Sequence, residues 1–577
     1  MTTTTSTVRP SDHWCPGCVP HEAFAILADV RADRPASRRQ ATATDRRASS
    51  GPADLIVRGG VVTMDPARPS AEALAVRDGR ILALGSVDDM APHAGADTEV
   101  LDLGDDVAYP GFVEPHMHLW TTALFDAFLD CSPLTHRSHE DVFAALREAA
   151  STTPDGGWVR GQLWDPSLFP GAPPLDRDLL DELVPDHPAF VMNASMHFAY
   201  LNSRALAAVG IDDDSADPDG GFYGRRDGRL DGVLGEFGAI SPAVARLPRL
   251  SHDEFLATLV RIAGVAAAAG VTRIHEAATG TLFGAAELDL LHELATADRL
   301  PVRVGIAVLD SARPRFDGCQ PGDGDDRVRV TSWKLIADGS NQGRSGRVRD
   351  PYLGTDERGV ANHSTTDLRD RMARAAAEGW QLMVHANGDA ALDQVLDAYE
   401  AIAPDPARRH RIEHSSLAGD DHFARMAALG VSPSFLMNHV YYWGHAFRDD
   451  ILGPERAATL DAAASARRHG LRISLHSDYR VSPISPLRSV QTAVTRQLRA
   501  GGTLNPDEAI SVEEALRAVT IDAAWQTHSD DRCGSLEVGK DADLVVLSAD
   551  PRQVAPTTIA DIEVRATYIA GRLVDTS

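Results

Sequence analysis

The sequence is poor in cysteine, in net positive charge and in long apolar runs. Five cysteines in 577 residues are too few for a disulfide framework, which favours a reducing, cytoplasmic location. A formal net charge of −27 argues against a nucleic-acid partner and against an anionic membrane surface. No apolar stretch reaches the roughly 18 residues of a membrane span, and the N-terminus lacks the apolar core of a secretory signal. We therefore expect a soluble cytoplasmic protein.

Residues 1–52 differ in composition from the rest of the chain. They are rich in Thr, Arg, Ala, Ser and Pro, which predicts a mobile N-terminal extension. Cys15 and Cys18 within it are compatible with a zinc knuckle or with two incidental thiols, because a second CxxC pair is missing.

Both ends of the remaining chain predict β-structure. The expected strands lie at residues 55–64, 73–85, 543–547 and 564–574. The first is expected to be a strand pair around Gly59-Gly60, and the second a hairpin with an Asp-Gly turn. We expect residues 53–108 and 525–577 to form one small β-sandwich.

His116 and His118 close a short apolar run that follows Pro110-Gly111. In a strand, residues i and i+2 point to the same face, so both imidazoles can reach one divalent ion. Taken alone, the pair is equally compatible with two surface histidines. Further ligands at other strand ends would make it specific.

Later strand-like runs also end on side chains that can bind metals. They are Trp333 to Gly339, Leu382 to His385, Arg411 to His414 and Leu471 to Asp478. Helix-like stretches separate them, which indicates parallel strands with helical crossovers. Ligands at the carboxyl ends of such strands are typical of an α/β protein with a (β/α)₈ TIM barrel. We expect the barrel over 109–524, with an inserted subdomain at about 120–260, a stretch too long for one crossover.

Six motifs occur in the order of a known family. They are PGFVEPHMH (110–118), WKLIADGS (333–340), VHANGDAALDQVLDAYE (384–400), RIEH (411–414), SLHSD (474–478) and GSLEVGKDADLVVL (534–547). The chain thereby resembles the amidohydrolase superfamily, in its YtcJ-like branch (amidohydrolase family 3), which includes N-substituted formamide deformylases. The resemblance implies a metal-dependent hydrolase on a distorted TIM barrel, with an inserted subdomain covering the site.

The resemblance also implies the metal ligands. They are His116, His118, Lys334, His385, His414 and Asp478. They would hold one or two divalent ions, with zinc as the expected metal. Lys334 would bridge two ions as a carbamate formed with CO₂, since an ammonium has no lone pair. The alternative is that Lys334 stays an ammonium and one metal is absent.

Asp478 and Lys334 are the expected catalytic residues. A divalent metal lowers the pKa of a bound water from about 15.7 to about 7, which supplies a metal-bound hydroxide. Asp478 would take a proton from the water and pass it to the leaving amine. The alternative for Asp478 is a helix cap, which the apolar run before it disfavours.

Other residues are expected around the ligands. The candidates for substrate contact are His197, Trp333, His439, Tyr441 and His445, and those for supporting the ligands are His476, Glu276 and Asp389. The stretch from His439 to His445 is an aromatic loop after a barrel strand, where specificity usually arises. The alternative for His197 is a structural role. Arg411 and Glu413 are expected to pair, with His414 pointing the opposite way.

These features predict a hydrolase that cleaves the non-peptide C–N bond of a small N-acyl or N-formyl amine. Hydrolysis of a cyclic amide, carbamate or ester is the alternative within enzymes. A metal-bound protein that binds small molecules without catalysis is the alternative of another class, and the complete ligand set argues against it. The expected partner is a small-molecule amide, and a homodimer is compatible with the sequence.

Overall fold

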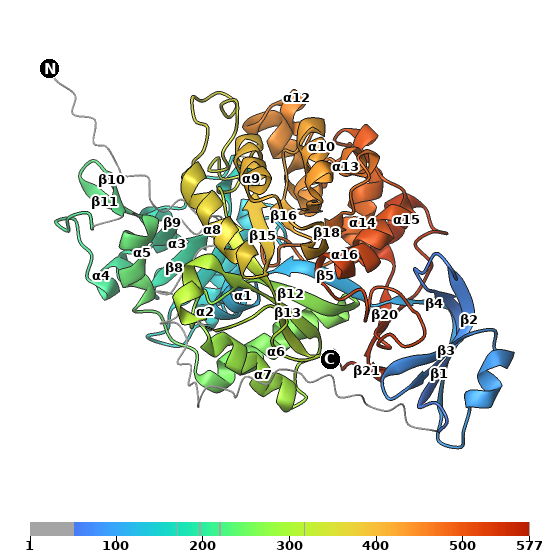
Figure 1. Cartoon of the computed structure of the whole chain (residues 1–577). Coiled ribbons are helices and arrows are strands. Elements are labelled where there is room, and N and C mark those ends of the chain that lie inside the picture. Colours follow the sequence, from blue (N-terminus) through green and yellow to red (C-terminus); the bar gives the residue numbers. More distant parts are fainter. Residues whose placement is uncertain (1–50, 170, 195–197, 219–220, 317, 576–577) are drawn as a thin grey trace.

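Eight parallel strands form the centre of the computed structural model, which describes residues 51–169, 171–194, 198–218, 221–316 and 318–575 (Figure 1). The strands are β5 (Phe112–Met117), β12 (Val271–Thr279), β13 (Arg303–Leu309), β14 (Val328–Ile336), β15 (Gln381–Ala386), β16 (Arg411–His414), β17 (Ser432–Phe435) and β18 (Ser474–Leu475). They pair in chain order from β5 to β18. A parallel bridge between Met117 and Tyr479 brings the two edges together. The sheet is therefore a nearly closed barrel, and the predicted α/β barrel is confirmed.

Helices lie between the barrel strands or follow the last of them. They include α6 (His252–Ala268), α7 (Ala286–Thr296), α8 (Thr365–Ala377), α9 (Asp389–Ile402), α10 (Asp420–Leu429), α13 (Ala463–Arg468), α14 (Pro486–Thr495), α15 (Val512–Ala518) and α16 (Ile521–Gln526). Every residue of β12, β13 and β15 is buried, as expected for parallel strands covered on both faces. The strand ends are thus fixed from both sides.

A second sheet lies between β5 and β12 in the chain. Its strands are β6 (Leu129–Asp130), β7 (Val159–Trp164), β8 (Ala189–Asn193), β9 (Phe198–Leu201), β10 (Phe222–Arg226) and β11 (Arg229–Gly235). They pair in the order β10-β11-β9-β8-β7-β6. Figure 1 shows β8 to β11 beside the barrel, on the left. This sheet falls in the range where an insertion was predicted, and the domain boundaries themselves stay predictions.

Strands from both ends of the described chain share a third sheet. They are β1 (Leu55–Val62), β2 (Ser70–Arg77), β3 (Arg80–Gly85), β4 (Glu99–Pro110), β19 (Leu544–Leu547), β20 (Val564–Ile569) and β21 (Arg572–Leu573). β19 pairs antiparallel with β4, which leads directly into β5. The hairpin of β2 and β3 is confirmed, with Asp78 and Gly79 at positive φ. The strand pair predicted around Gly59 is wrong: β1 is one strand with a bulge there, where Gly59 has φ of 128° and passes close to Leu103.

The helices and the cysteines of the structure can be compared with the expectations from composition. None of the helices in the described residues combines the length and the apolar character of a membrane span. The buried cysteines Cys131 and Cys533 are free thiols. Cys15 and Cys18 lie outside the described residues.

Candidate metal centre and active site

Two histidines meet one aspartate at the carboxyl ends of β5 and β18. His116 belongs to β5, and His118 precedes α1 (Leu119–Phe125) as its N-cap. His116 Nε2 lies 3.3 Å and His118 Nε2 lies 3.1 Å from the same Asp478 Oδ1. All three side chains are buried. The spacing of two residues places both rings at one point, as the strand periodicity predicted.

Three further histidines join this group. The ring centroids of His385 and His414 are 4.5 Å apart, and His414 lies 4.9 Å from His116. His476 stacks on His116 at 4.7 Å with an interplanar angle of 14°. The sequence placed His476 behind the ligands, whereas the structure places it in direct contact with one of them.

Lys334 reaches the same point from β14. Its side chain is fully buried, and Nζ lies 3.4 Å from His116 Nε2. The structure thus brings together all six residues that the resemblance implied as ligands.

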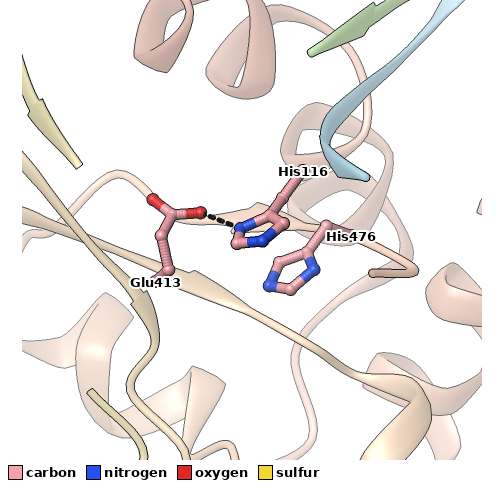
Figure 2. A group of neighbouring side chains, drawn as sticks. All are labelled: His116, Glu413 and His476. Carbon is pink, nitrogen blue, oxygen red and sulfur yellow. Dashed lines mark hydrogen bonds and ion pairs between the residues drawn. The ribbon is translucent and has the colours of Figure 1, made fainter. Parts of the chain in front are cut away.

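Glu413 also belongs to the cluster. From the sequence, this residue was expected only to pair with Arg411. Glu413 Oε2 lies 2.5 Å from His116 Nδ1 (Figure 2), and Oε1 lies 2.9 Å from Arg411 Nε. The predicted pair with Arg411 is therefore present. The expectation that His414 points away from Glu413 is wrong, because His414 has φ of 66° and leaves the alternating strand geometry. Burial raises the pKa of Glu413, and Arg411 opposes this.

Asp338, rather than Asp389, is the buried carboxylate next to His385. Asp338 Oδ1 lies 3.5 Å from His385 Nε2, and the carboxylate accepts hydrogen bonds from three backbone amides. Burial raises its pKa to about 6. The Asp389 carboxylate accepts instead from the amides of Arg349 and Ala390 at the start of α9. The supporting role predicted for Asp389 therefore belongs to Asp338, whose position after β14 was the available signal.

Two buried glutamates fix the segments that carry the ligands. Glu276 accepts hydrogen bonds from the amides of Ala278, at 2.9 Å, and Leu119, the residue after His118. Glu114 accepts from the Ser477 amide at 3.0 Å, next to Asp478. Burial raises the pKa of both glutamates, to about 8 for Glu114. Glu276 therefore acts on the backbone that carries His118.

The aromatic segment 439–445 after β17, which was predicted to be a loop, is helical: His439–Trp443 is a π-helix and Gly444–Ala446 a short α-helix. It approaches the cluster through His439. This ring is buried, lies 3.4 Å from Ser416 Oγ through Nδ1, and has its pKa lowered by burial to about 3. Tyr441 lies under the Arg488 guanidinium, 4.6 Å from its carbon, and His445 is half-buried. Neither is among the residues that line the pocket described below.

Trp333 is not brought to the cluster. Trp333 follows the opposite face of β14 from Lys334. Its Nε1 donates to Asp310 at 2.8 Å, and its ring packs on Trp380. These contacts do not support the predicted contact with substrate. His197 lies outside the described residues.

A pocket of about 490 Å³ opens beside His118. One wall comes from the barrel side and includes Ser340, Gln342, Trp443, Arg480 and Val481. The other comes from the inserted sheet and includes Gln162, Leu163, Asn193, Phe198, Tyr200 and Val233. Trp443 belongs to the loop that was predicted to contact substrate. The sequence alone gave no pairing between this loop and the inserted strands.

The donor set suits a divalent transition metal. Imidazole nitrogens and carboxylate oxygens are zinc ligands in proteins, and those of His116, His118 and Asp478 lie within 4.8 Å of one another. His476 is 1% exposed, and neither ring nitrogen has a hydrogen-bond partner among the described residues. Buried polar atoms in such a state are uncommon unless another group meets them. The residues present therefore fit a metal ion.

The fold and this site together define a metal-dependent hydrolase on a (β/α)₈ barrel. Residues 99–575 match the sequence profile of the amidohydrolase family, and the chain belongs to that family. The resemblance stated from the motifs is confirmed. The protein is an enzyme, a metal-dependent hydrolase of carbon–nitrogen bonds.

Known proteins similar to this chain agree. An N-substituted formamide deformylase of Arthrobacter pascens is 30% identical, over 90% of this chain and 97% of its own. The amidohydrolase YtcJ of Bacillus subtilis (strain 168) is 29% identical, over 89% and 98%. The crystal structure of an uncharacterized metal-dependent hydrolase from Pyrococcus horikoshii OT3 superposes with a TM-score of 0.69 at 21% identity, covering 87% of this chain and 99% of that one. The last similarity establishes the fold.

Proposed function

We propose that the protein hydrolyses the amide bond of a small N-acyl or N-formyl amine, with one or two zinc ions as cofactor. The convergence of the six strand-end residues beside a pocket of about 490 Å³ carries this proposal. The similarity to an N-substituted formamide deformylase supports the substrate class. The apolar side chains of the pocket suit an apolar or aromatic amine substituent.

In this proposal His116, His118 and Asp478 hold one ion, and His385 and His414 hold a second. A bound divalent ion lowers the pKa of a water molecule and polarises the amide carbonyl. Asp478 accepts a proton from the attacking water and later donates it to the leaving nitrogen. Its place 3.1 Å from His118, which lines the pocket, supports this role.

We further propose that the Lys334 amine forms a carbamate, which would offer two oxygen ligands to the metal site. The neutral Nζ attacks CO₂, a nitrogen–carbon bond forms, and one proton is released, which leaves two carboxylate oxygens on the side chain. The complete burial of Lys334, with Nζ 3.4 Å from His116 Nε2, places the amine beside the proposed ligands and supports this proposal. A carbamate NMR signal in protein loaded with isotope-labelled CO₂ and zinc, absent from Lys334→Met, tests it. A free amine in fully metallated protein would contradict it.

Elemental analysis and a matched substrate screen test the whole proposal. Protein purified without chelator should contain one or two zinc ions per chain and should cleave N-formyl and N-acyl amines faster than matched esters, carbamates or cyclic amides. Asp393→Asn is the control, because Asp393 belongs to a carboxylate–histidine group with Asp421 and His422 that pairs with Arg349 at the surface. This variant should keep metal and rate. Trace metal with activity that survives chelation would refute the proposal.

A further inference from the structure

Arg480 lines the pocket with a guanidinium nitrogen that meets no acceptor in the part of the chain that the structure describes. Its Nη1 is buried and forms no hydrogen bond within the described residues. Two fully or nearly fully buried arginines of the barrel meet carboxylates: Arg411 pairs with Glu413, and Arg303 with Asp543. Arginine stays charged at all physiological pH values and donates in a planar fork. A buried nitrogen of this kind usually has an acceptor.

Arg480 is close to the reacting centre. It lies two residues after Asp478 in the chain and shares the pocket with His118. The Tyr479 carbonyl accepts a hydrogen bond from the His118 amide at 2.7 Å, which ties the two segments together. A molecule in this pocket can therefore face the ligand cluster and Arg480 at once.

The surroundings of Arg480 in the pocket are largely apolar. Phe125, Leu163, Phe198, Val233 and Val481 line the same cavity. A cation in such surroundings loses hydration, and a bidentate carboxylate offsets that loss better than any neutral acceptor.

Asp165 is the acidic residue in the same pocket as Arg480. Its negative charge contributes to the raised pKa of Tyr200, after burial. Asp165 already has an interaction within the protein, whereas Arg480 Nη1 forms no hydrogen bond with any described residue. The positive charge is therefore the one that remains available to a ligand.

We infer that the amide substrate carries a carboxylate that binds Arg480. The substrate class is an N-acylated or N-formylated amino acid with an apolar or aromatic side chain. This inference rests on the proposed function and narrows it. Arg480 is thus a residue that determines specificity.

Matched substrates test the inference with purified zinc-loaded enzyme. N-formylphenylalanine and N-formylphenethylamine differ by the carboxylate alone. Arg480→Gln should lower kcat/KM for the first by about 10–100-fold, mainly through KM, because a charge-assisted hydrogen bond is lost, and should leave the second nearly unchanged. Arg480→Lys should retain part of the preference. Arg448→Gln is the control, because Arg448 pairs with Asp449 at the surface.

A binding measurement keeps the two proposals separable. Phenylmethanesulfonate is an anionic, weakly metal-binding probe, and benzyl methyl sulfone is its neutral match. Calorimetry should show tighter binding of the sulfonate, lost in Arg480→Gln. If the sulfonate binds in this way but neither amide is cleaved, the proposed function fails and the anion site stands. If both amides are cleaved equally in wild type and variant, or phenethylammonium binds better than the sulfonate, the inference is overturned and the proposed function stands.

Discussion

His116 and His118 both approach one carboxylate oxygen of Asp478, at 3.3 and 3.1 Å. Asp478→Asn keeps the shape of the side chain but removes its ability to take a proton from water. We expect kcat to fall by about 10²–10⁴-fold, with the fold retained in circular dichroism and some metal lost. A variant that keeps nearly the parental rate would exclude Asp478 from the proton transfers.

Glu413 orients the proposed metal ligand His116 by contacting Nδ1, the ring nitrogen that does not face Asp478. Its Oε2 lies 2.5 Å from His116 Nδ1 and so orients Nε2 toward the cluster. Partners of this kind typically change metal affinity by 10–100-fold when removed, and we expect zinc to bind Glu413→Gln about 10–100-fold more weakly. Competition with a chelator measures the affinity. Glu400→Gln, on a carboxylate that pairs with Arg425 at the surface, should have no effect, and equal affinities for the two variants would contradict the role of Glu413.

The proposed metal ligands could be predicted from the sequence. The carboxylates that contact these ligands could not be predicted as well. His116 and His118 share a strand face by periodicity, and the other ligands end their own strands, so their meeting follows from the barrel. Glu413 and Asp338 were missed for a different reason. The role of Glu413 depends on a contact with a side chain of a separate strand, His116, over 297 residues of chain, and no local pattern encodes such a contact. Asp338 follows β14 directly, which is a local signal, but its contact with His385 of the next strand is not visible in the sequence.

At the scale of elements, several strand ends break the extended geometry where chemistry is needed. His414 and Asp478 have φ of 66° and 51°, in a region that costs non-glycine residues on the order of 1–3 kcal/mol. The break at His414 lets two consecutive residues of β16, Glu413 and His414, face one cluster. The surrounding packing must hold this conformation, since both side chains are buried.

A buried ion pair joins the barrel to the segment that leads into β19. Arg303 of β13 contacts Asp543 through Nε at 2.7 Å and Nη2 at 3.1 Å. Arg303→Met leaves the Asp543 carboxylate buried without its cation, and we expect a loss of about 3–5 kcal/mol in the free energy of unfolding. Urea unfolding followed by tryptophan fluorescence measures it.

The surface pair of Arg448 and Asp449 provides the comparison. Arg448→Met should cost less than about 1 kcal/mol, because an exposed ion pair contributes little. Equal losses of unfolding free energy in both variants would show that the contact between Arg303 and Asp543 does not hold the third sheet to the barrel.

At the scale of the whole molecule, Gly51 and Ala53 bond to segments that follow them in the chain. The Gly51 carbonyl accepts from Arg77 Nη1 at 2.6 Å, and the Ala53 amide donates to His93. Every proposed ligand comes after residue 115. Removal of residues 1–50 should therefore leave zinc content and kcat unchanged, as measured by elemental analysis and steady-state kinetics. A folded, metallated protein with lowered kcat would show that this segment acts at the site.

The barrel was predictable because alternating strands and helices leave few topologies. The details at its edges were not. β18 is two residues long, Ser474–Leu475, although the apolar run before Asp478 predicted a longer strand. β1 remains one strand through Gly59 because the bulge is fixed by the approach of β4. Pairing across distant segments decided both outcomes.

The pocket takes its walls from two sheets, and this separation has an evolutionary consequence. Gln162, Asn193 and Phe198 come from the inserted sheet, whereas the six proposed ligands come from the barrel. Mutations in the inserted strands change the pocket wall that contacts a bound molecule. They leave unaltered the barrel strand ends that carry the proposed metal ligands. Substrate preference can therefore diverge between lineages that retain one reaction. Two descendants with identical metal ligands need not act on the same substrate.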